Sequence, residues 1–160
     1  MAQIYSIVYQ PLDREYGERL DDYIRVPVVE VDLLAGHGIE GDQKAGHHPD
    51  RQVNLLSNEW LQTLRPRGYR TAPGEFGEQL VIQGLVQEDL QPGDRLQLGE
   101  QACIELTKPR TGCTRLEAAQ GQPIAGIDGF VGWLAKVVAG GKIRVGDQVT
   151  VLSAEPMEDA

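Results

Sequence analysis

The sequence has only two cysteines, Cys103 and Cys113, and no Cys-x-x-Cys pair, so neither a disulfide framework nor a common zinc motif is expected. No apolar run approaches the roughly 20 residues that span a bilayer, and the N-terminus lacks the pattern of a signal peptide. The 15 basic residues are outnumbered by 24 acidic ones, which gives a net charge of −9. Nucleic acid and anionic membranes both require clustered positive charge, so we expect neither as a partner, and we expect a cytoplasmic protein.

What is present is a series of short alternating or β-branched runs, separated by Gly, Pro and Asp. This spacing is typical of strands joined by turns, and nothing alternates strands with long helices as a doubly wound α/β sheet requires. The sequence therefore predicts a mainly β fold, an all-β barrel with a few short helices. The expected strands cover residues 4–9, 26–31, 52–56, 80–82, 95–98, 102–106, 133–139 and 148–152.

Two short helices and two repeated turns complete the expected elements. Ser57 is a suitable N-cap for one helix, which Pro66 and Gly68 would end, and a second helix is expected to start near Cys113. The residues 90–98 resemble 143–151, because in both an apolar residue leads to Gly-Asp and then to a strand. The glycine pair at 140–141 predicts a tight hairpin between strand 133–139 and the residues that follow.

The length of 160 residues predicts a single domain. We expect its core at about 26–152, a charged loop or arm at 9–25, and a frayed tail at 153–160.

Cys113 is the more reactive of the two thiols on sequence grounds. Lys108, Arg110 and Arg115 lie within five residues of it, and a helix is expected to begin just after it. Cations and a helix N-terminus favour the thiolate, which is both a nucleophile and a ligand for soft metals. A loop cysteine without a role remains open, and Cys103 is expected to be a small packed residue within a strand.

The three histidines, His37, His47 and His48, match no metal-ligand or protease pattern. We therefore expect them to bind no catalytic metal, and we expect residues 47–50 to form an exposed polar turn. The neighbouring glycine-rich stretch lacks the spacing of a phosphate loop, although Lys44 and Arg51 could supply charge to an anion there.

Five segments, taken in their order along the chain, resemble the MOSC domain, the family named after the C-terminal domain of molybdenum cofactor sulfurases. The resemblance spans about residues 26–152, and the chain is identified as a stand-alone member. Two positions depart from the usual family pattern: Gln79 stands where Asn is common, and Gly112 precedes Cys113 where Pro is common. The five segments are Gly38-Ile39-Glu40-Gly41-Asp42, Arg51-Gln52-Val53-Asn54-Leu55-Leu56-Ser57, Pro73-Gly74-Glu75-Phe76-Gly77-Glu78-Gln79-Leu80, Lys108-Pro109-Arg110-Thr111-Gly112-Cys113 and Gly140-Gly141-Lys142-Ile143-Arg144-Val145-Gly146-Asp147.

The resemblance implies a MOSC-type closed β-barrel and a site for the molybdenum cofactor (molybdopterin). In that site Cys113 would ligate molybdenum or carry sulfur as a persulfide. Arg51, Lys108 and Arg110 would hold the anionic cofactor and are expected to converge on one mouth of the barrel. The polar side chains of Gln52, Asn54 and Gln79 would add hydrogen bonds.

Three functions follow from the resemblance and stay open at the level of sequence. The first is a molybdenum-dependent oxidoreductase that reduces N-hydroxylated small molecules. It would need an external electron donor, because the sequence shows no flavin or iron–sulfur motif. The second is a sulfur carrier that delivers a persulfide from Cys113 to an acceptor protein. The third is a non-catalytic module that binds a small molecule.

Overall fold

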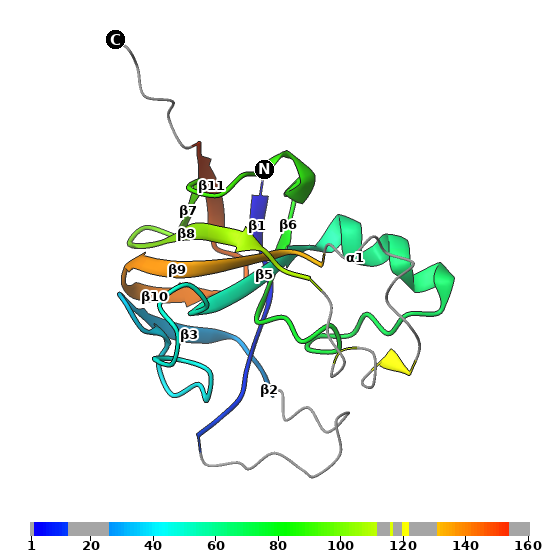
Figure 1. The fold of residues 1–160 in the computed structure, drawn as a ribbon, viewed down its shortest axis with the longest axis horizontal. Coiled ribbons are helices and arrows are strands. Elements are labelled where there is room, and N and C mark those ends of the chain that lie inside the picture. Colours follow the sequence, from blue (N-terminus) through cyan, green and yellow to red (C-terminus); the bar gives the residue numbers. More distant parts are fainter. Residues whose placement is uncertain (1, 13–25, 112–115, 117–119, 122–130, 154–160) are drawn as a thin grey trace.

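The computed structural model describes residues 2–12, 26–111, 116, 120–121 and 131–153. Strands are the main regular structure of these residues, with one short α-helix at the side of the sheet (Figure 1). The strands are β1 (Ala2–Tyr9), β2 (Val26–Val28), β3 (Glu30–Leu34), β4 (Gly38–Ile39), β5 (Val53–Ser57), β6 (Leu80–Gln83), β7 (Arg95–Leu98), β8 (Ala102–Pro109), β9 (Trp133–Ala139), β10 (Gly141–Arg144) and β11 (Gln148–Leu152).

Seven of the described strands close a barrel in the order β11-β7-β8-β9-β5-β6-β1, and β1 then pairs with β11 to complete the ring. The short strand β2 extends the sheet beside β1. Strands β5 and β6 run parallel, whereas the other described pairings are antiparallel. The predicted closed barrel is therefore confirmed, and closure leaves the ring without free edges.

A separate sheet of three described strands, in the order β10-β3-β4, corrects the hairpin predicted at Gly140-Gly141. Strand β10 pairs with β3, for example Lys142 with Asp32, and not with β9. Gly140 allows its backbone to approach the backbone of β3 closely. A Cβ at this position would lie 2.7 Å from the Leu33 carbonyl oxygen. The sequence identified the glycine pair but not the partner of the strand that follows it.

The barrel interior holds the main hydrophobic core. On β8 the residues Ala102, Ile104 and Leu106 are buried, and the residues between them are partly exposed, as the two-residue period of a strand requires. Leu106 pairs with Ala135 of β9, which in turn pairs with Val53 of β5, so one row of inward side chains crosses three strands. Each fully buried Leu or Ile contributes roughly 1.5–3 kcal/mol to the free energy of folding.

Helix α1 (Asn58–Leu64) covers a second core on the outside of β5 and β6. The outward residues Leu56 and Val81 pack there with Leu61, Leu64 and the buried Phe76. The predicted N-cap is confirmed, since Ser57 Oγ accepts a hydrogen bond from the Trp60 backbone N–H at 3.2 Å.

The end of this helical segment is also as predicted. A 3₁₀ turn, η1 (Arg65–Arg67), contains Pro66, and Gly68 follows it with a left-handed φ of 94°. Helix α1 is therefore limited to two turns by chemistry that the local sequence displays.

The repeated Gly-Asp turns before β7 and β11 have the same internal hydrogen bond. Asp94 Oδ2 accepts from the Gln91 backbone N–H, and Asp147 Oδ2 accepts from the Arg144 N–H, each at 2.9 Å. Gly93 and Gly146 precede the aspartates with φ of 95° and 97°. Strands β7 and β11 then pair with each other. The weak repeat in the sequence thus corresponds to two equivalent turns that feed adjacent strands.

The predicted arm at 9–25 is wrong at its beginning. Tyr9 belongs to β1, Gln10 is fully buried, and Pro11 forms an isolated bridge with Asp42. Backbone hydrogen bonds to the Asp42 region hold this part of the chain, so it is not a solvated loop. Residues 13–25 lie outside the described residues, as do 154–160 of the predicted tail and most of the predicted second helix.

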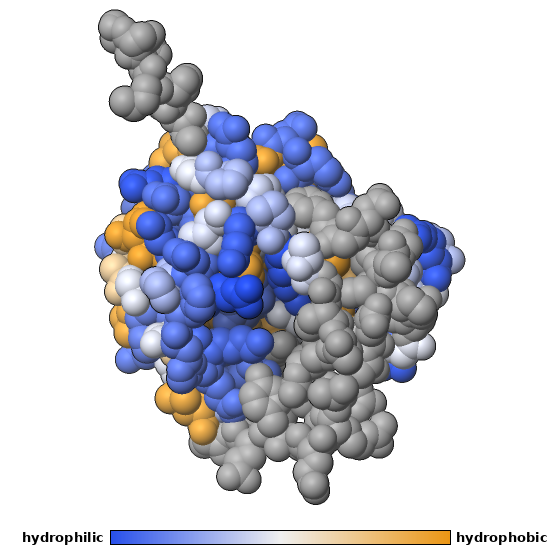
Figure 2. Space-filling view, viewed as in Figure 1, coloured by the Kyte–Doolittle hydropathy of each residue, from blue (hydrophilic) through white to orange (hydrophobic). Residues whose placement is uncertain are grey.

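The face of the molecule over β7, β8 and β9 carries mostly hydrophilic residues (Figure 2). Arg95 and Lys136 both form ion pairs with Glu105 there, at 3.0 and 3.8 Å. Within the described part of the chain, no helix has the length and apolar character needed to cross a membrane.

Candidate functional site

Strand β5 and the loop before β6 are joined by two amide side chains, Asn54 and Gln79. The Gln79 backbone N–H donates to Asn54 Oδ1 at 2.6 Å, and the Asn54 backbone N–H donates to Gln79 Oε1 at 2.9 Å. Asn54 Nδ2 also donates to the Gly77 carbonyl at 3.2 Å. Both side chains are buried, and these contacts are with the protein itself. Their predicted hydrogen bonds to a cofactor stay a prediction.

Asp42 is the centre of a buried polar cluster that includes Gln79. Its Oδ2 accepts hydrogen bonds from Gln79 Nε2 at 2.9 Å and from the Lys44 backbone N–H at 3.1 Å. Its Oδ1 accepts from the Gln10 backbone N–H at 2.7 Å. A carboxylate that is 3% exposed must be surrounded by donors, and three are present here. Asp42 therefore ties together the end of β1, the loop after β4 and the start of β6.

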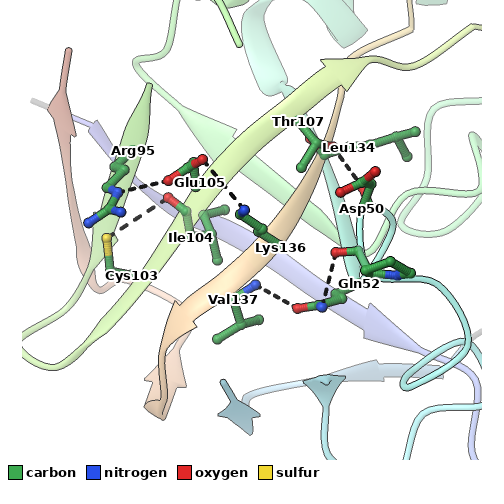
Figure 3. A network of polar contacts seen from close by, with 11 residues as sticks. Asp50, Gln52, Arg95, Cys103, Ile104, Glu105, Thr107, Leu134, Lys136 and Val137 are labelled. Carbon is green, nitrogen blue, oxygen red and sulfur yellow. Dashed lines mark hydrogen bonds and ion pairs between the residues drawn. The ribbon is translucent and has the colours of Figure 1, made fainter. Parts of the chain in front are cut away.

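Gln52 fixes the segment that carries Arg51 against strand β9. Gln52 Oε1 accepts from the Val137 backbone N–H at 2.8 Å, and Gln52 Nε2 donates to the Pro49 carbonyl at 3.1 Å (Figure 3). The Thr107 hydroxyl lies 2.7 Å from the Asp50 carbonyl oxygen, which accepts its hydrogen bond. These contacts draw the 48–52 loop across β9 toward the end of β8 (Figure 3).

Two of the three cations predicted to bind an anion lie on the segments joined in this way. Arg51 follows Asp50, Lys108 follows Thr107, and both side chains are exposed. Neither Arg51 nor Lys108 has an ion pair to a described residue. An exposed pair of cations on adjacent segments is suited to an anionic group.

Arg110 takes a different position, next to the loop at 74–78. Its Nη2 donates to the Phe76 carbonyl at 2.6 Å. The Glu78 carboxylate accepts from the backbone N–H groups of Gly74 at 2.6 Å and Phe76 at 3.0 Å. Gly74, with φ of 88°, allows the turn that aims its N–H at Glu78. Convergence of Arg110 with the other two cations stays a prediction.

Glu78 is fully buried, and burial raises the pKa of its carboxyl group above the ordinary value. The backbone hydrogen bonds from Gly74 and Phe76 and the charge of Arg110 oppose that rise but are smaller effects. The raised pKa favours the protonated form of this buried carboxyl group beside Arg110.

Of the two cysteines, Cys103 belongs to the part of the chain that the structure describes. Cys113 lies outside the described residues. Cys103 is the second residue of β8 and lies on its outward, partly exposed face, next to the ion pair of Arg95 with Glu105 (Figure 3). It is thus less enclosed than the packed residue expected from the sequence. Burial raises the pKa of the Cys103 thiol, Arg95 lowers it and Glu105 raises it.

The histidine segment is the exposed polar turn that the sequence predicts. Residues 47–50 are all exposed, and His48 Nδ1 accepts from the Asp50 backbone N–H at 3.1 Å. Among the residues that the structure describes, no three His, Cys, Asp or Glu side chains are grouped as metal ligands require.

Sequence reasoning missed Asp42 and Glu78 as organising residues of this region. Each lies in a glycine-rich turn, which is a common place for an exposed carboxylate. The signal that marks both residues is their place in two of the five segments that carry the family resemblance. Partners that are 32 and 37 residues distant from Asp42 cannot be read from the local sequence.

The fold and the polar cluster define a class of protein: a closed β-barrel domain in which a buried carboxylate and two amides fix the loops at one end. A family model described as "MOSC domain" matches residues 42–150. The chain belongs to the MOSC domain family.

Two bacterial proteins and one fungal protein are similar to this chain in sequence. Protein YiiM of Escherichia coli is 28% identical over 76% of this chain, and protein YflK of Bacillus subtilis is 28% identical over 90%. A protein of Gibberella moniliformis named "Reductase" is 29% identical over 74% of this chain. The matches span 59% of YiiM, 70% of YflK and 21% of the fungal protein.

Solved structures agree with this assignment of the fold. The crystal structure of YiiM from Escherichia coli has a TM-score of 0.66 at 28% identity, covering 94% of this chain and 70% of that one. The YuaD protein of Bacillus subtilis has a TM-score of 0.75 at 19% identity, covering 97% and 98% of the two chains, and shows a shared fold alone.

Proposed function

We propose that this protein binds the molybdenum cofactor through Arg51, Lys108 and Arg110 and reduces N-hydroxylated small molecules. The observation that carries the proposal is the contact between Thr107 and Asp50, because it brings two exposed cations onto adjacent segments in a chain of net charge −9. Family membership and a relative named "Reductase" support the choice of cofactor and reaction class.

The described residues fit an anionic cofactor in their chemistry. Arg51 and Lys108 offer donors without a competing carboxylate among the described residues, and guanidinium and ammonium groups both bind phosphate. The loop that contains Glu78 positions the Arg110 guanidinium, because the Phe76 carbonyl oxygen accepts a hydrogen bond from Arg110 Nη2. The Asp42 cluster keeps the loops in place, so the cations need little reordering when an anion binds.

When bound, the cofactor supplies a metal centre that exchanges electrons with the substrate. Reduction of an N-hydroxylated compound breaks the N–O bond, consumes two electrons and two protons, and releases water. The electrons come from an external donor protein, the substrate is a small molecule, and Cys113 is the proposed ligand to molybdenum.

The proposal is tested on protein purified from a host that makes the cofactor, by elemental analysis and pterin fluorescence. We expect stoichiometric molybdenum in the native chain and in Cys103→Ser, and its loss in Cys113→Ser. Arg51→Gln and Lys108→Gln should each lower the molybdenum content. Lys136→Gln is the matched control, because Lys136 is paired with Glu105 on the outer face and should leave the content unchanged.

A sulfur carrier gives a different result in the same preparation. Cyanide-releasable sulfur that depends on Cys113, without molybdenum, would contradict the reductase and support delivery of sulfur to an acceptor protein. Full molybdenum loading in Arg51→Gln and Lys108→Gln would show that these cations do not hold the cofactor.

A further inference from the structure

A cavity of about 520 Å³ lies between helix α1 and the turn that follows β6, on the outside of the barrel. We call it the α1 groove, and its principal lining residues are Glu59, Trp60, Gly84, Leu85, Val86 and Glu88. Its volume is in the range of small-molecule sites. The lining is mainly apolar, and Val86 remains 58% exposed in the described fold.

Hydrogen bonds fix the two walls of the α1 groove relative to each other. The Gly84 backbone N–H donates to both carboxylate oxygens of Glu59, at 3.0 and 2.9 Å. The Ser57 backbone N–H donates to Gln87 Oε1 at 2.8 Å, which ties the end of β5 to the turn η2 (Gln87–Asp89). The groove is thus formed before any ligand arrives, which lowers the cost of ordering on binding.

Trp60 gives the groove an aromatic wall. Its ring makes an edge contact with Phe76 at 5.8 Å between centroids, and it is only partly buried. The contact with Phe76 anchors one side of the indole, while the remaining surface lines the groove with Leu85 and Val86. An indole face is the best of the aromatic surfaces for holding a cation.

Negative charge borders this apolar surface. Glu59 and Glu88 both line the groove, and neither has an ion pair with a described residue. The partners of Glu59 are the Gly84 N–H and the Ser57 hydroxyl, which are both neutral donors, so the charge of the carboxylate is not cancelled. Two carboxylates next to an indole favour a cation and repel an anion.

We propose that the α1 groove binds a small organic amine with an apolar body, whose ammonium group lies near Glu59 and Glu88 and whose apolar part packs on Trp60, Leu85 and Val86. The site is separate from the proposed cofactor site. It lies at the Ser57 end of β5, whereas Gln52 and Arg51 precede the other end of that strand. An anionic cofactor is excluded from the groove by its charge.

The test uses 3-phenylpropylamine as the probe, with 3-phenylpropanol and 3-phenylpropionate as neutral and anionic analogues of the same shape. Binding is followed by isothermal titration and by the indole N–H signal of Trp60, which is assigned from its absence in Trp60→Phe. We expect saturable binding of the amine that shifts this signal, and at least fivefold weaker binding of both analogues.

Two charge-reversal variants are compared, one at Glu88 in the α1 groove and one at Glu100 outside it. Glu88→Lys should weaken the amine roughly tenfold, because attraction is replaced by repulsion at an exposed position. Glu100→Lys, at the exposed turn between β7 and β8, should leave the affinity unchanged. Equal binding of the three probes, no saturable shift of the Trp60 signal, or equal effects of the two lysine variants would each overturn the proposal. Molybdenum content plays no part in the measurement, so this test and that of the proposed function fail independently.

Discussion

Asn54 and Gln79 exchange side-chain hydrogen bonds with each other's backbone across 25 residues of sequence, directly before the parallel pairing of Leu55 with Leu80. The two amides therefore set the register in which β5 and β6 align. In antiparallel neighbours a tight turn can set the register, but parallel strands have no such turn between them. The side chains supply the alignment that the connection cannot.

The first prediction concerns this pair. Asn54→Ala and Gln79→Ala should each destabilise the fold, because each leaves one buried backbone N–H without its acceptor, at a cost of roughly 1–3 kcal/mol. The two losses should be close to additive in the double variant, because each side chain bonds the other residue's backbone, which alanine retains. Urea unfolding of the four proteins measures the three losses. Losses below about 0.5 kcal/mol in both single variants would mean that these bonds do not support the alignment of β5 with β6.

The second prediction concerns the pH dependence of stability through Glu78. Its pKa is raised in the folded state, so the folded chain binds a proton more readily than the unfolded chain. The stabilising contribution is complete below the ordinary carboxyl pKa of 4.5 and declines as the pH rises toward the folded pKa. Glu78→Gln should remove this decline.

Urea unfolding between about pH 4 and pH 8 provides the measurement. The stability of Glu78→Gln relative to the native chain should improve as the pH increases. Glu100→Gln is the control, since that side chain is exposed and should leave the pH profile unchanged. A relative stability that worsens with rising pH would indicate that Arg110 and the backbone donors outweigh burial.

The third prediction concerns the reactivity of Cys103. In a Cys113→Ser background Cys103 is the remaining thiol, and its pKa is raised by burial, so alkylation by iodoacetamide at neutral pH should be slower than for a free thiol. Arg95→Gln should slow the reaction further, because it removes a charge that lowers the pKa. Glu105→Gln should accelerate it for the opposite reason.

The pH dependence of the alkylation rate reports the thiol pKa in each variant. A faster alkylation of Cys103 in Arg95→Gln would contradict the statement that the charge of Arg95 lowers the thiol pKa. Lys142→Gln, on the other sheet, is the control for a general change of surface charge.

The fourth prediction compares two glycines with left-handed backbones. A Cβ at Gly38, where φ is 128°, would lie 2.6 Å from the Gln52 carbonyl oxygen, whereas a Cβ at Gly36, where φ is 72°, meets nothing within 4 Å. Gly36→Ala should therefore cost only the backbone term of about 1–2 kcal/mol. Gly38→Ala should cost more, because the Arg51–Gln52 segment must also shift. Thermal unfolding of both variants distinguishes them, and equal losses would show that the close approach carries no penalty.

Local chemistry made much of the fold predictable. Strands β7, β9 and β11 coincide with the runs expected from alternation, and Ser57 begins α1 as its side chain predicts. The pairing of strands was harder to predict from the sequence, because the partner of β10 is β3, which lies more than a hundred residues earlier in the chain. The separation of β2 from β3 at Val29 was also missed, because the four valines of residues 26–31 indicate one continuous strand.

The role of the buried amides in the candidate site could not be predicted from the sequence either. The sequence marks Asn54, Gln79 and Gln52 as polar residues among apolar ones, which is typical of ligand binding and equally of internal bracing. Here each braces the backbone: Gln52 holds Val137, and Asn54 and Gln79 hold each other. Which use a buried amide serves depends on the groups that face it, and those come from distant segments.

Closure of the barrel by β1 and β11 has a consequence for how the protein is made. Ala2 pairs with Val149 and Gln3 with Gln148, so β1 leaves the ribosome well before β11, and the ring is complete only when β11 has been made. Until then the Ala2–Gln3 end of β1 lacks this partner, and its N–H and C=O groups can pair with another chain. Contacts between such distant residues also close slowly. We therefore expect nascent chains that end before β11 to remain open-edged and prone to aggregation, and synthesis of β11 to be the step that protects the barrel.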